Sequence, residues 1–251
     1  MIDVHCHLEQ PDYDNDREDV IKRCRENLKA VITCCVHPKN LDLTMKMMDN
    51  HENFIFAAYG IHPEYIKDLN HKEIDNFIER IKESKERIVA VGETGLDFFW
   101  IKEREWQKKQ EELFIQLIDL SKQIKKPLLI HSRDAYEDIL KILEQEDARK
   151  VLLHLWGGYN LIGRVEENNW NVSVGPILLR SKKYKKMVRD ISVERIMTET
   201  DSPWFGIGEK RGYPTNVKFV IEKIAEIKKM GFNEVDKITT ENAIKFFELK
   251  I

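Results

Sequence analysis

Short apolar runs alternate with long, charged segments along the whole chain, and no other feature of the sequence constrains the fold as strongly. The apolar runs are Ile2–His5, Ala30–Val36, Phe54–Gly60, Ile88–Glu93, Pro127–His131, Lys150–His154, Trp170–Gly175 and Arg195–Glu199. Within these runs the apolar character is largely continuous and does not alternate strictly with polar residues. That pattern is typical of parallel strands that helices cover from the outside.

The charged segments between the runs have the periodicity of helices. Apolar residues recur at helical spacing in Glu73–Ile88, Glu103–Lys126 and Val217–Met230, and Gly231 is the predicted stop of the last segment. Eight strand–helix units in 251 residues predict an α/β fold of the (β/α)8, or TIM-barrel, type. We expect a single hydrolase domain over residues 1–251, with its active site at the C-terminal ends of the strands.

An open, doubly wound sheet is the main alternative arrangement of such units. It would normally carry a glycine-rich phosphate-binding loop after the first strand. Here the first strand leads into His5-Cys-His-Leu-Glu9, and neither GxGxxG nor GxxxxGK followed by Ser or Thr occurs in the sequence. The sequence therefore favours the closed barrel.

Composition and charge exclude several classes of protein. Apolar residues make up 42% of the chain and charged residues 34%, which excludes an intrinsically disordered chain, a collagen-like repeat and a disulfide-stapled miniprotein. The 41 basic and 44 acidic residues give a net charge of −3. No overall basic field draws the protein onto nucleic acid, so a nucleic-acid substrate would have to be held by local groups or by metal ions.

The cysteines and the first residues predict a cytoplasmic protein. None of the four cysteines forms a CxxC pair, and residues 1–9 lack the basic and apolar regions of a secretory signal. The longest apolar runs fall far short of the ~18 residues that a membrane span needs. We expect reduced thiols and no membrane contact, and no feature implies a protein partner.

Polar residues interrupt the apolar runs at their C-terminal ends, where barrel enzymes build their active sites. His5 and His7 lie two residues apart, so on a strand their side chains point to the same side. Four further residues occupy corresponding positions on other predicted strands or directly after them: Glu93, His131, His154 and Asp201. One such histidine is more often structural than a metal ligand, but burying all six together without an ion would be costly. They predict a metal site.

The number of these side chains indicates two cations. Four imidazoles and two carboxylates exceed what one tetrahedral zinc ion uses, and a carboxylate can bridge two cations through its two oxygens. Glu93, on a middle strand of the set, is the candidate bridge. The mixed nitrogen and oxygen donors leave Zn²⁺, Mg²⁺, Mn²⁺, Fe²⁺ and Co²⁺ open.

The motifs around these residues resemble those of the TatD family of metal-dependent deoxyribonucleases, which are amidohydrolase-like barrels. The matching stretches are DVHCHL (3–8), GIHPE (60–64), VGETGLD (91–97), HSRDA (131–135), ETDSP (199–203) and TTENAIKFF (239–247). They lie in family order along essentially the whole chain. Two departures flank the substrate cleft. The family's usual HCFSG after the sixth strand is HLWGG (154–158) here, and its basic, Asn-containing loop before the last proline is KRGYP (210–214) here.

The resemblance implies a role for each matching residue. His5, His7, Glu93 and Asp201 would hold one metal, and Glu93, His131 and His154 would hold the second. His62 and Arg133 would face the substrate phosphate. The alternative for Arg133 is a rim ion pair with Asp134 or Glu137, and the alternative for His62 is a turn residue fixed by Pro63.

The favoured chemistry is hydrolysis of DNA phosphodiester bonds by a metal-activated water, with Asp201 as candidate base and Glu93 as catalytic bridge. We expect an exonuclease-type enzyme whose substrate is single-stranded DNA or strand ends. The alternative is an amide or ester hydrolase of the same barrel, such as a D-aminoacyl-tRNA deacylase, since a metal hydroxide also attacks carbonyl carbon. A metal-binding protein without activity is the third, disfavoured alternative.

Two further groups of residues bear on a nucleic-acid substrate. Aromatic residues just beyond strand ends could stack exposed bases, although packing beneath loops is the commoner role for each of them; they are Phe98, Phe99, Trp100, Trp156, Trp204 and Phe205. The basic run Arg180–Arg189 could follow a nucleic-acid backbone, but a solvated helix face is the favoured interpretation.

Overall fold

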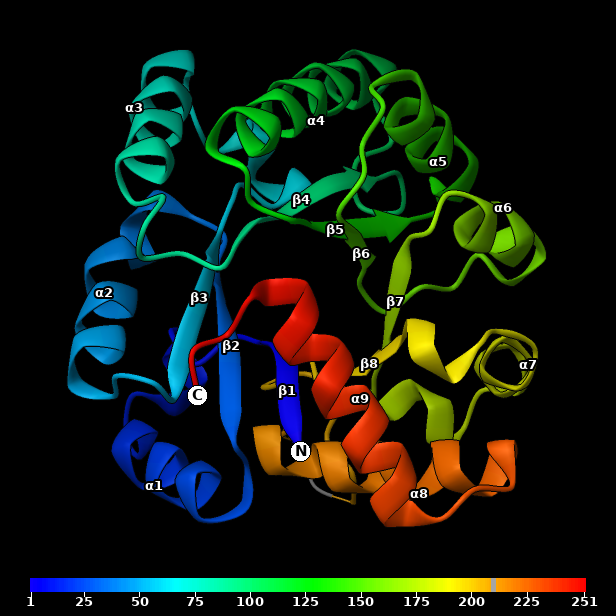
Figure 1. Ribbon diagram of the computed structural model, residues 1–251. Helices are drawn as coiled ribbons and strands as arrows, with labels where there is room; N and C mark the ends of the chain where they lie inside the picture. The colour runs from blue at the N-terminus through cyan, green and yellow to red at the C-terminus, as the bar shows by residue number, and fades with distance from the viewer. Residues whose placement is uncertain (209–210) are drawn as a thin grey trace.

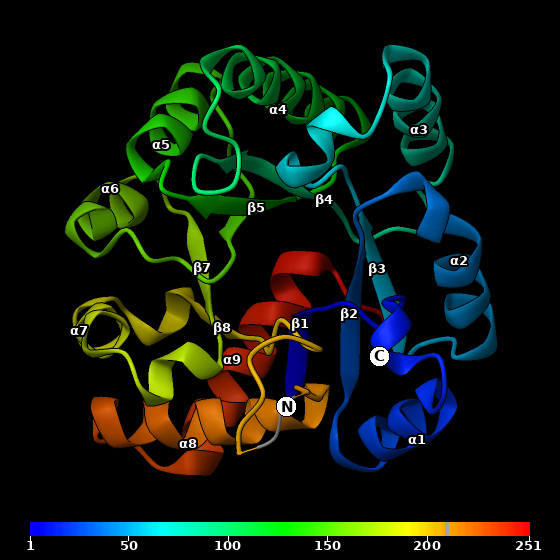
Figure 2. The same ribbon diagram turned by 180° about the vertical axis from the view of Figure 1, so that it is seen from behind.

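The computed structural model describes residues 1–208 and 211–251 and confirms the predicted (β/α)8 barrel. Eight parallel strands form one sheet in chain order, and the helices surround it (Figures 1 and 2). The strands are β1 (Ile2–Cys6), β2 (Ala30–Cys35), β3 (Ile55–Tyr59), β4 (Ala90–Asp97), β5 (Leu128–Arg133), β6 (Val151–Leu153), β7 (Asn171–Val174) and β8 (Ile196–Thr198). Each of them coincides with, or overlaps, one predicted apolar run.

The first and last strands close the barrel through hydrogen bonds just beyond β8. The backbone N–H of Asp201 donates to the carbonyl oxygen of His5 at 2.9 Å, and that of His7 donates to the carbonyl oxygen of Ser202 at 2.8 Å. The segment after β8 is therefore bound directly to the histidine pair at the end of β1.

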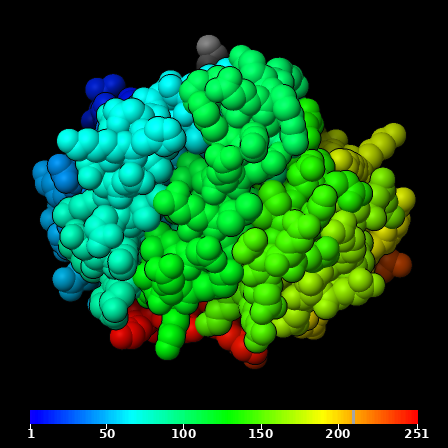
Figure 3. All heavy atoms as spheres, turned by 90° about the horizontal axis from the view of Figure 1, so that it is seen from above, coloured from blue at the N-terminus to red at the C-terminus, as the bar shows by residue number. Residues whose placement is uncertain are grey.

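The helices form the outer wall of the barrel, and the space-filling view in Figure 3 shows the part made by the middle of the chain. Their apolar faces pack against the strands, which is the burial that stabilises a parallel sheet on its outer side. In the described residues they are α1 (Arg17–Asn27), α2 (Leu41–Asn50), α3 (His71–Glu83), α4 (Arg104–Ile124), α5 (Tyr136–Gln145), α6 (Ile162–Glu167), α7 (Lys182–Asp190), α8 (Val217–Lys228) and α9 (Phe232–Phe247).

Helix α9 lies across one end of the barrel and leaves the other end for the functional residues (Figures 1 and 2). Phe246 and Phe247 of this helix pack on an inner cluster of strand residues, among them Ile2 and Ala30 near the strand starts. The N-terminal end of the barrel is thus filled by apolar side chains. A polar site within the barrel must lie at the C-terminal end, as predicted.

Strand β4 differs from its predicted course because Glu93 does not end it. The strand runs on to Asp97, and its register with β5 shifts between Gly92 and Thr94, which is a bulge at Glu93. Gly95 has φ +143°, and a Cβ there would lie 2.0 Å from the carbonyl oxygen of His131. Only glycine permits this close approach of β4 to β5, which the apolar pattern could not reveal.

Gly231 is not the stop of α8, and that prediction is wrong. The helix ends at Lys228, and Lys229 adopts the left-handed conformation with φ 55° that was expected of a glycine. Gly231 is instead the N-cap of α9. Within the described residues, no helix combines the length and the apolar character that crossing a bilayer requires.

Candidate metal centre

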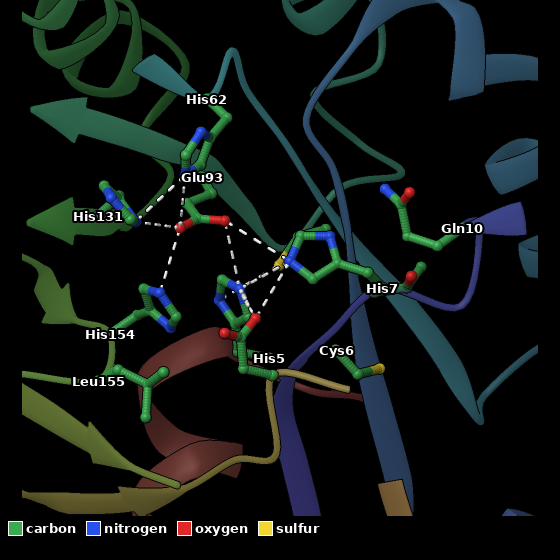
Figure 4. A network of polar contacts seen from close by, with 12 residues as sticks. His5, Cys6, His7, Gln10, His62, Glu93, His131, His154 and Leu155 are labelled. Carbon is green, nitrogen blue, oxygen red and sulfur yellow. Dashed lines mark hydrogen bonds and ion pairs between the residues drawn. The ribbon is translucent and has the colours of Figure 1, made fainter. Parts of the chain in front are cut away.

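All six predicted ligand residues converge at the C-terminal end of the barrel. Figure 4 shows His5, His7, His131 and His154 arranged around the carboxylate of Glu93. They come from β1, β4, β5 and the ends of β6 and β8, so the sheet brings together residues that are far apart in the chain. Five of the six are buried, and His131 is partly buried.

The carboxylate of Glu93 divides the surrounding groups into two sets. Its Oε2 lies 3.3 Å from Nε2 of His5 and 3.6 Å from Nε2 of His7. Its Oε1 lies 2.9 Å from Nδ1 of His131 and 3.2 Å from Nε2 of His154. Because each oxygen faces a different pair of imidazoles, Glu93 has the arrangement of a bridging ligand.

Asp201 belongs to only one of these sets. Its Oδ1 lies 3.6 Å from Nε2 of His5 and 3.5 Å from Nε2 of His7. Its backbone has φ 52°, in the left-handed region, and its N–H is held by the carbonyl of His5. The turn after β8 therefore aims this carboxylate at the histidine pair of β1.

Each of the four imidazoles has an inner nitrogen that faces Glu93 and an outer nitrogen that faces away from it. Further polar groups contact the four outer nitrogens. Nδ1 of His7 lies 3.1 Å from Glu9, Nε2 of His131 lies 3.0 Å from Asp97, and Nδ1 of His154 lies 3.1 Å from Glu199. For His5 the outer contact is the Sγ of Cys34, at 3.5 Å from Nδ1. A carboxylate that accepts a hydrogen bond from the outer nitrogen leaves the inner nitrogen with a lone pair directed at Glu93.

Burial and the surrounding imidazoles shift the pKa values of Glu93 and Asp201 in opposite directions. Burial by itself would raise the pKa of Glu93, but the imidazoles of His154, His5 and His62 outweigh it and hold that pKa well below its usual value. Burial also opposes ionisation of Asp201, and the hydrogen bond with His7 outweighs it, so the pKa of Asp201 is lowered. Both side chains are anionic at neutral pH.

The donor set fits divalent cations. Burial by itself would lower the pKa of His7, but Glu9 and Asp201 overcome this and raise the pKa to about 10. A proton on this imidazole thus supplies positive charge that the buried carboxylates require. A divalent cation between the inner nitrogens and oxygens would supply that charge instead, and the borderline mixture of imidazole and carboxylate suits Zn²⁺, Mn²⁺, Fe²⁺ or Co²⁺.

His62 reaches the same cluster but differs from the other histidines in its outer contact. Its Nε2 lies 3.2 Å from Nδ1 of His131 and 3.6 Å from Oε1 of Glu93, close enough for a metal ligand. Its Nδ1 accepts a hydrogen bond from the backbone N–H of Glu64 at 3.2 Å. Burial and the charge of His131 lower the pKa of His62 to about 3. The neutral ring therefore carries its proton on Nε2, which makes it a hydrogen-bond donor directed into the site.

Arg133 lies on the rim and does not form the alternative ion pair with Asp134 or Glu137. Its guanidinium carbon is 4.0 Å from the ring centre of Phe99 and 5.3 Å from that of Trp100. Glu137 pairs with Arg164 instead, at 3.0 Å. Stacking on Phe99 positions the guanidinium while its N–H groups stay available to another acceptor.

The aromatic and basic residues noted in the sequence have different surroundings. Trp156 is buried, Phe98 and Phe205 are half-buried, and Phe99, Trp100 and Trp204 are exposed. The basic run forms α7, whose lysines lie largely on its exposed side. Only three of the six aromatic residues are thus presented to solvent.

Sequence reasoning missed the outer groups Glu9, Asp97, Glu199 and Cys34. The only signal for Glu9 is that it continues the two-residue spacing of His5 and His7, but the strand ends at Cys6 and residue 9 lies in a turn. Asp97 and Glu199 lie within the quoted stretches VGETGLD and ETDSP, but nothing in the stretches shows which imidazole each one contacts. Cys34 is one of two adjacent cysteines in an apolar run and carries no signal.

Asp97→Asn should weaken cation binding about 10- to 100-fold. Oδ1 of Asp97 accepts the backbone N–H groups of Phe99 and Trp100 at 3.0 and 2.8 Å, and Oδ2 faces His131. An asparagine that keeps both backbone contacts would turn its NH₂ toward Nε2 of His131. The imidazole proton would then move to Nδ1, the nitrogen that faces Glu93.

Competition with a chromogenic chelator measures this effect, and Asp119→Asn, at an exposed carboxylate of α4, is the matched control. Cation affinity equal to that of the unmodified protein would contradict the orienting role of Asp97.

Comparisons with known proteins show relatives over nearly the whole chain. The family described as "TatD related DNase" matches residues 2–248. The chain is 34% identical to a Bacillus subtilis protein named an uncharacterized metal-dependent hydrolase, with 99% of each chain covered. It is 31% identical to the human protein named Deoxyribonuclease TATDN3, covering 98% of this chain and 94% of the human one.

Solved structures show the same fold. The crystal structure of YJJV, a TatD homolog from Escherichia coli, superimposes with a TM-score of 0.91 at 21% identity and covers 100% of this chain and 98% of its own. A TatD family hydrolase from Entamoeba histolytica gives a TM-score of 0.89 at 18% identity, with 100% and 98% covered. At these identities the likeness concerns the fold.

Proposed function

Because this chain belongs to the TatD family of metal-dependent hydrolases, we propose that it is a deoxyribonuclease that hydrolyses DNA phosphodiester bonds. We further propose an exonuclease-type action on single strands or strand ends. The name of the human relative supports the choice of DNA. The observation that carries the proposal is the division of the cluster by Glu93, with one pair of imidazoles at each carboxylate oxygen.

The proposed ligands follow from the two sets. His5, His7, Asp201 and Oε2 of Glu93 would hold one cation, and His131, His154 and Oε1 of Glu93 would hold the other. Two divalent cations bound there would supply the Lewis acidity that makes a water nucleophilic near neutral pH and offsets the charge of the phosphate.

The chain's own polar groups then handle the proton and the phosphate. Asp201 is anionic and next to the His5–His7 pair, so it can orient the attacking water and accept its proton. Nε2–H of His62 can donate to a phosphate oxygen on the His131 side. Arg133, stacked on Phe99, can pair with a phosphate bidentately. These contacts are local, as a chain of net charge −3 requires.

The test is to assay the metal-depleted protein, supplied with each divalent cation in turn, on single-stranded DNA, duplex DNA, RNA and a D-aminoacyl-tRNA. We expect cleavage of DNA with at least one cation, faster on single strands, and none in excess chelator. Hydrolysis confined to the aminoacyl ester would refute the nuclease and favour the amide or ester hydrolase.

Arg133→Ala sharpens the same test. Loss of one phosphate contact should raise KM on DNA and make the salt slope of log Kobs on single strands shallower by about 0.7. On an uncharged carbonyl substrate the variant should behave as the unmodified protein does. Unchanged DNA cleavage and an unchanged salt slope would remove the phosphate role from Arg133.

A further inference from the structure

Three large aromatic side chains are exposed around the metal centre. In the described residues, Phe99, Trp100 and Trp204 expose 39%, 55% and 46% of their surface. All three lie in segments that follow strands at the C-terminal end of the barrel, after β4 and β8. Apolar surface grouped around a polar site is typical of a site that binds a ligand.

Trp204 lies on the side of the first ligand set. Its ring is 4.7 Å from that of His7, with 66° between the two planes, so the indole and imidazole meet edge to face. The backbone N–H of Trp204 donates to the carbonyl of Asp201 at 3.1 Å. Gly212 is held nearby as well, because its backbone N–H donates to the carbonyl of Pro203 at 2.7 Å and its carbonyl accepts the hydroxyl of Tyr13 at 2.8 Å. Trp204 is thus held in place while nearly half of its surface faces solvent.

Phe99 and Trp100 lie on the side of the second ligand set. Their backbone N–H groups donate to Asp97, the carboxylate that contacts His131. The two rings meet edge to face at 4.9 Å, and Arg133 covers Phe99 at 4.0 Å. Trp100, the more exposed of the two, is the one available for a further stacking contact.

We propose that Trp204 and Trp100 each stack on one base of the two nucleotides that flank the scissile phosphate. The inference rests on the proposed nuclease function. A phosphate bound over Glu93 would lie between the two ligand sets. On the first side the ring of Trp204 contacts His7. On the second side Trp100 is bound through its backbone to Asp97, and its ring centre lies 5.3 Å from the guanidinium carbon of Arg133. Both bases must then leave a duplex stack, since a paired and stacked base has no free face. The two tryptophans therefore select unpaired nucleotides without reading their sequence.

Binding of short oligonucleotides tests this inference without relying on cleavage. The probe is a fluorescently labelled single-stranded tetranucleotide with a non-hydrolysable central linkage, and fluorescence anisotropy with the metal-loaded protein gives its affinity. Trp204→Ala and Trp100→Ala should each weaken binding by roughly 5- to 150-fold, the range of one base–aromatic stack. Phe219→Ala is the matched control, because Phe219 is 43% exposed but lies on α8.

Tetranucleotides in which one central nucleotide is abasic separate stacking from a general disturbance of the site. Removing one base should abolish the effect of one tryptophan variant and keep that of the other, and removing the neighbouring base should do the reverse. Unchanged binding by both variants, or an equal loss on normal and abasic probes, would overturn the inference. DNA cleavage with such a result would leave the proposed function standing. Base-dependent binding without cleavage of any DNA would instead refute the nuclease.

Discussion

Glu93→Gln should eliminate binding of two cations and lower DNA cleavage by at least about 10³-fold, or ~4 kcal/mol of barrier. Among the residues that the structure describes, the carboxylate of Glu93 is the group that faces both ligand sets, with Oε2 on the side of His5 and Oε1 on the side of His131. Glutamine has nearly the same shape but offers one neutral oxygen and an NH₂ group. Either the His5 side or the His131 side would then face the NH₂ group of glutamine, a hydrogen-bond donor, in place of a carboxylate oxygen.

Metal content of the purified variant, measured by elemental analysis, gives the result directly, and circular dichroism verifies that the barrel is intact. Glu112→Gln, at an exposed residue of α4, is the matched control. A Glu93→Gln protein that holds two cations and cleaves DNA at the normal rate would show that Glu93 is not the bridge.

Asp201→Asn should lower turnover by roughly 10²- to 10⁴-fold while the protein keeps its fold and much of its metal, which corresponds to about 3–5 kcal/mol of barrier. The amide oxygen can still face His5 and His7, but the side chain can no longer accept a proton from water. Turnover is measured at saturating metal, so that a change in affinity does not enter.

His5→Ala is the contrasting variant because it removes a ligand and leaves the proposed base in place. Excess cation should restore part of its activity, whereas it should restore none to Asp201→Asn. Asp49→Asn, at an exposed carboxylate, controls for the chemical change alone. Full turnover by metal-saturated Asp201→Asn would remove Asp201 from the proton-transfer step.

The residues that form the centre of the site could be found from the sequence because strand ends share one edge of a barrel. Once eight apolar runs are taken as parallel strands in chain order, a polar residue at the end of any run must lie at the same end of the barrel. His5 with His7, His131 and His154 follow from that rule, although β5 does not end at His131 as predicted but continues to Arg133. Glu93 does not follow from it in detail, because a bulge and the glycines beside it direct its side chain from within β4 and not from its end.

The role of His62 could not be derived from its sequence motif and depends on the structure. It follows β3 in a turn, and the GIHPE motif carries no information on which of its nitrogens holds the proton. The backbone N–H of Glu64 decides this, since it donates to Nδ1 and leaves Nε2 as the donor directed at the cluster. The same holds for Arg133, whose position depends on the ring of Phe99 at the end of the neighbouring strand.

The sequence by itself determined the barrel, the end at which the site lies and the identity of the six convergent side chains, because these depend on periodicity and strand order. The tertiary structure alone decided how the groups divide between the two oxygens of Glu93, which acidic residue supports which histidine, and which aromatic rings reach solvent. Those properties depend on contacts between strands that are distant in the chain, at separations of about 3 Å that no local pattern records.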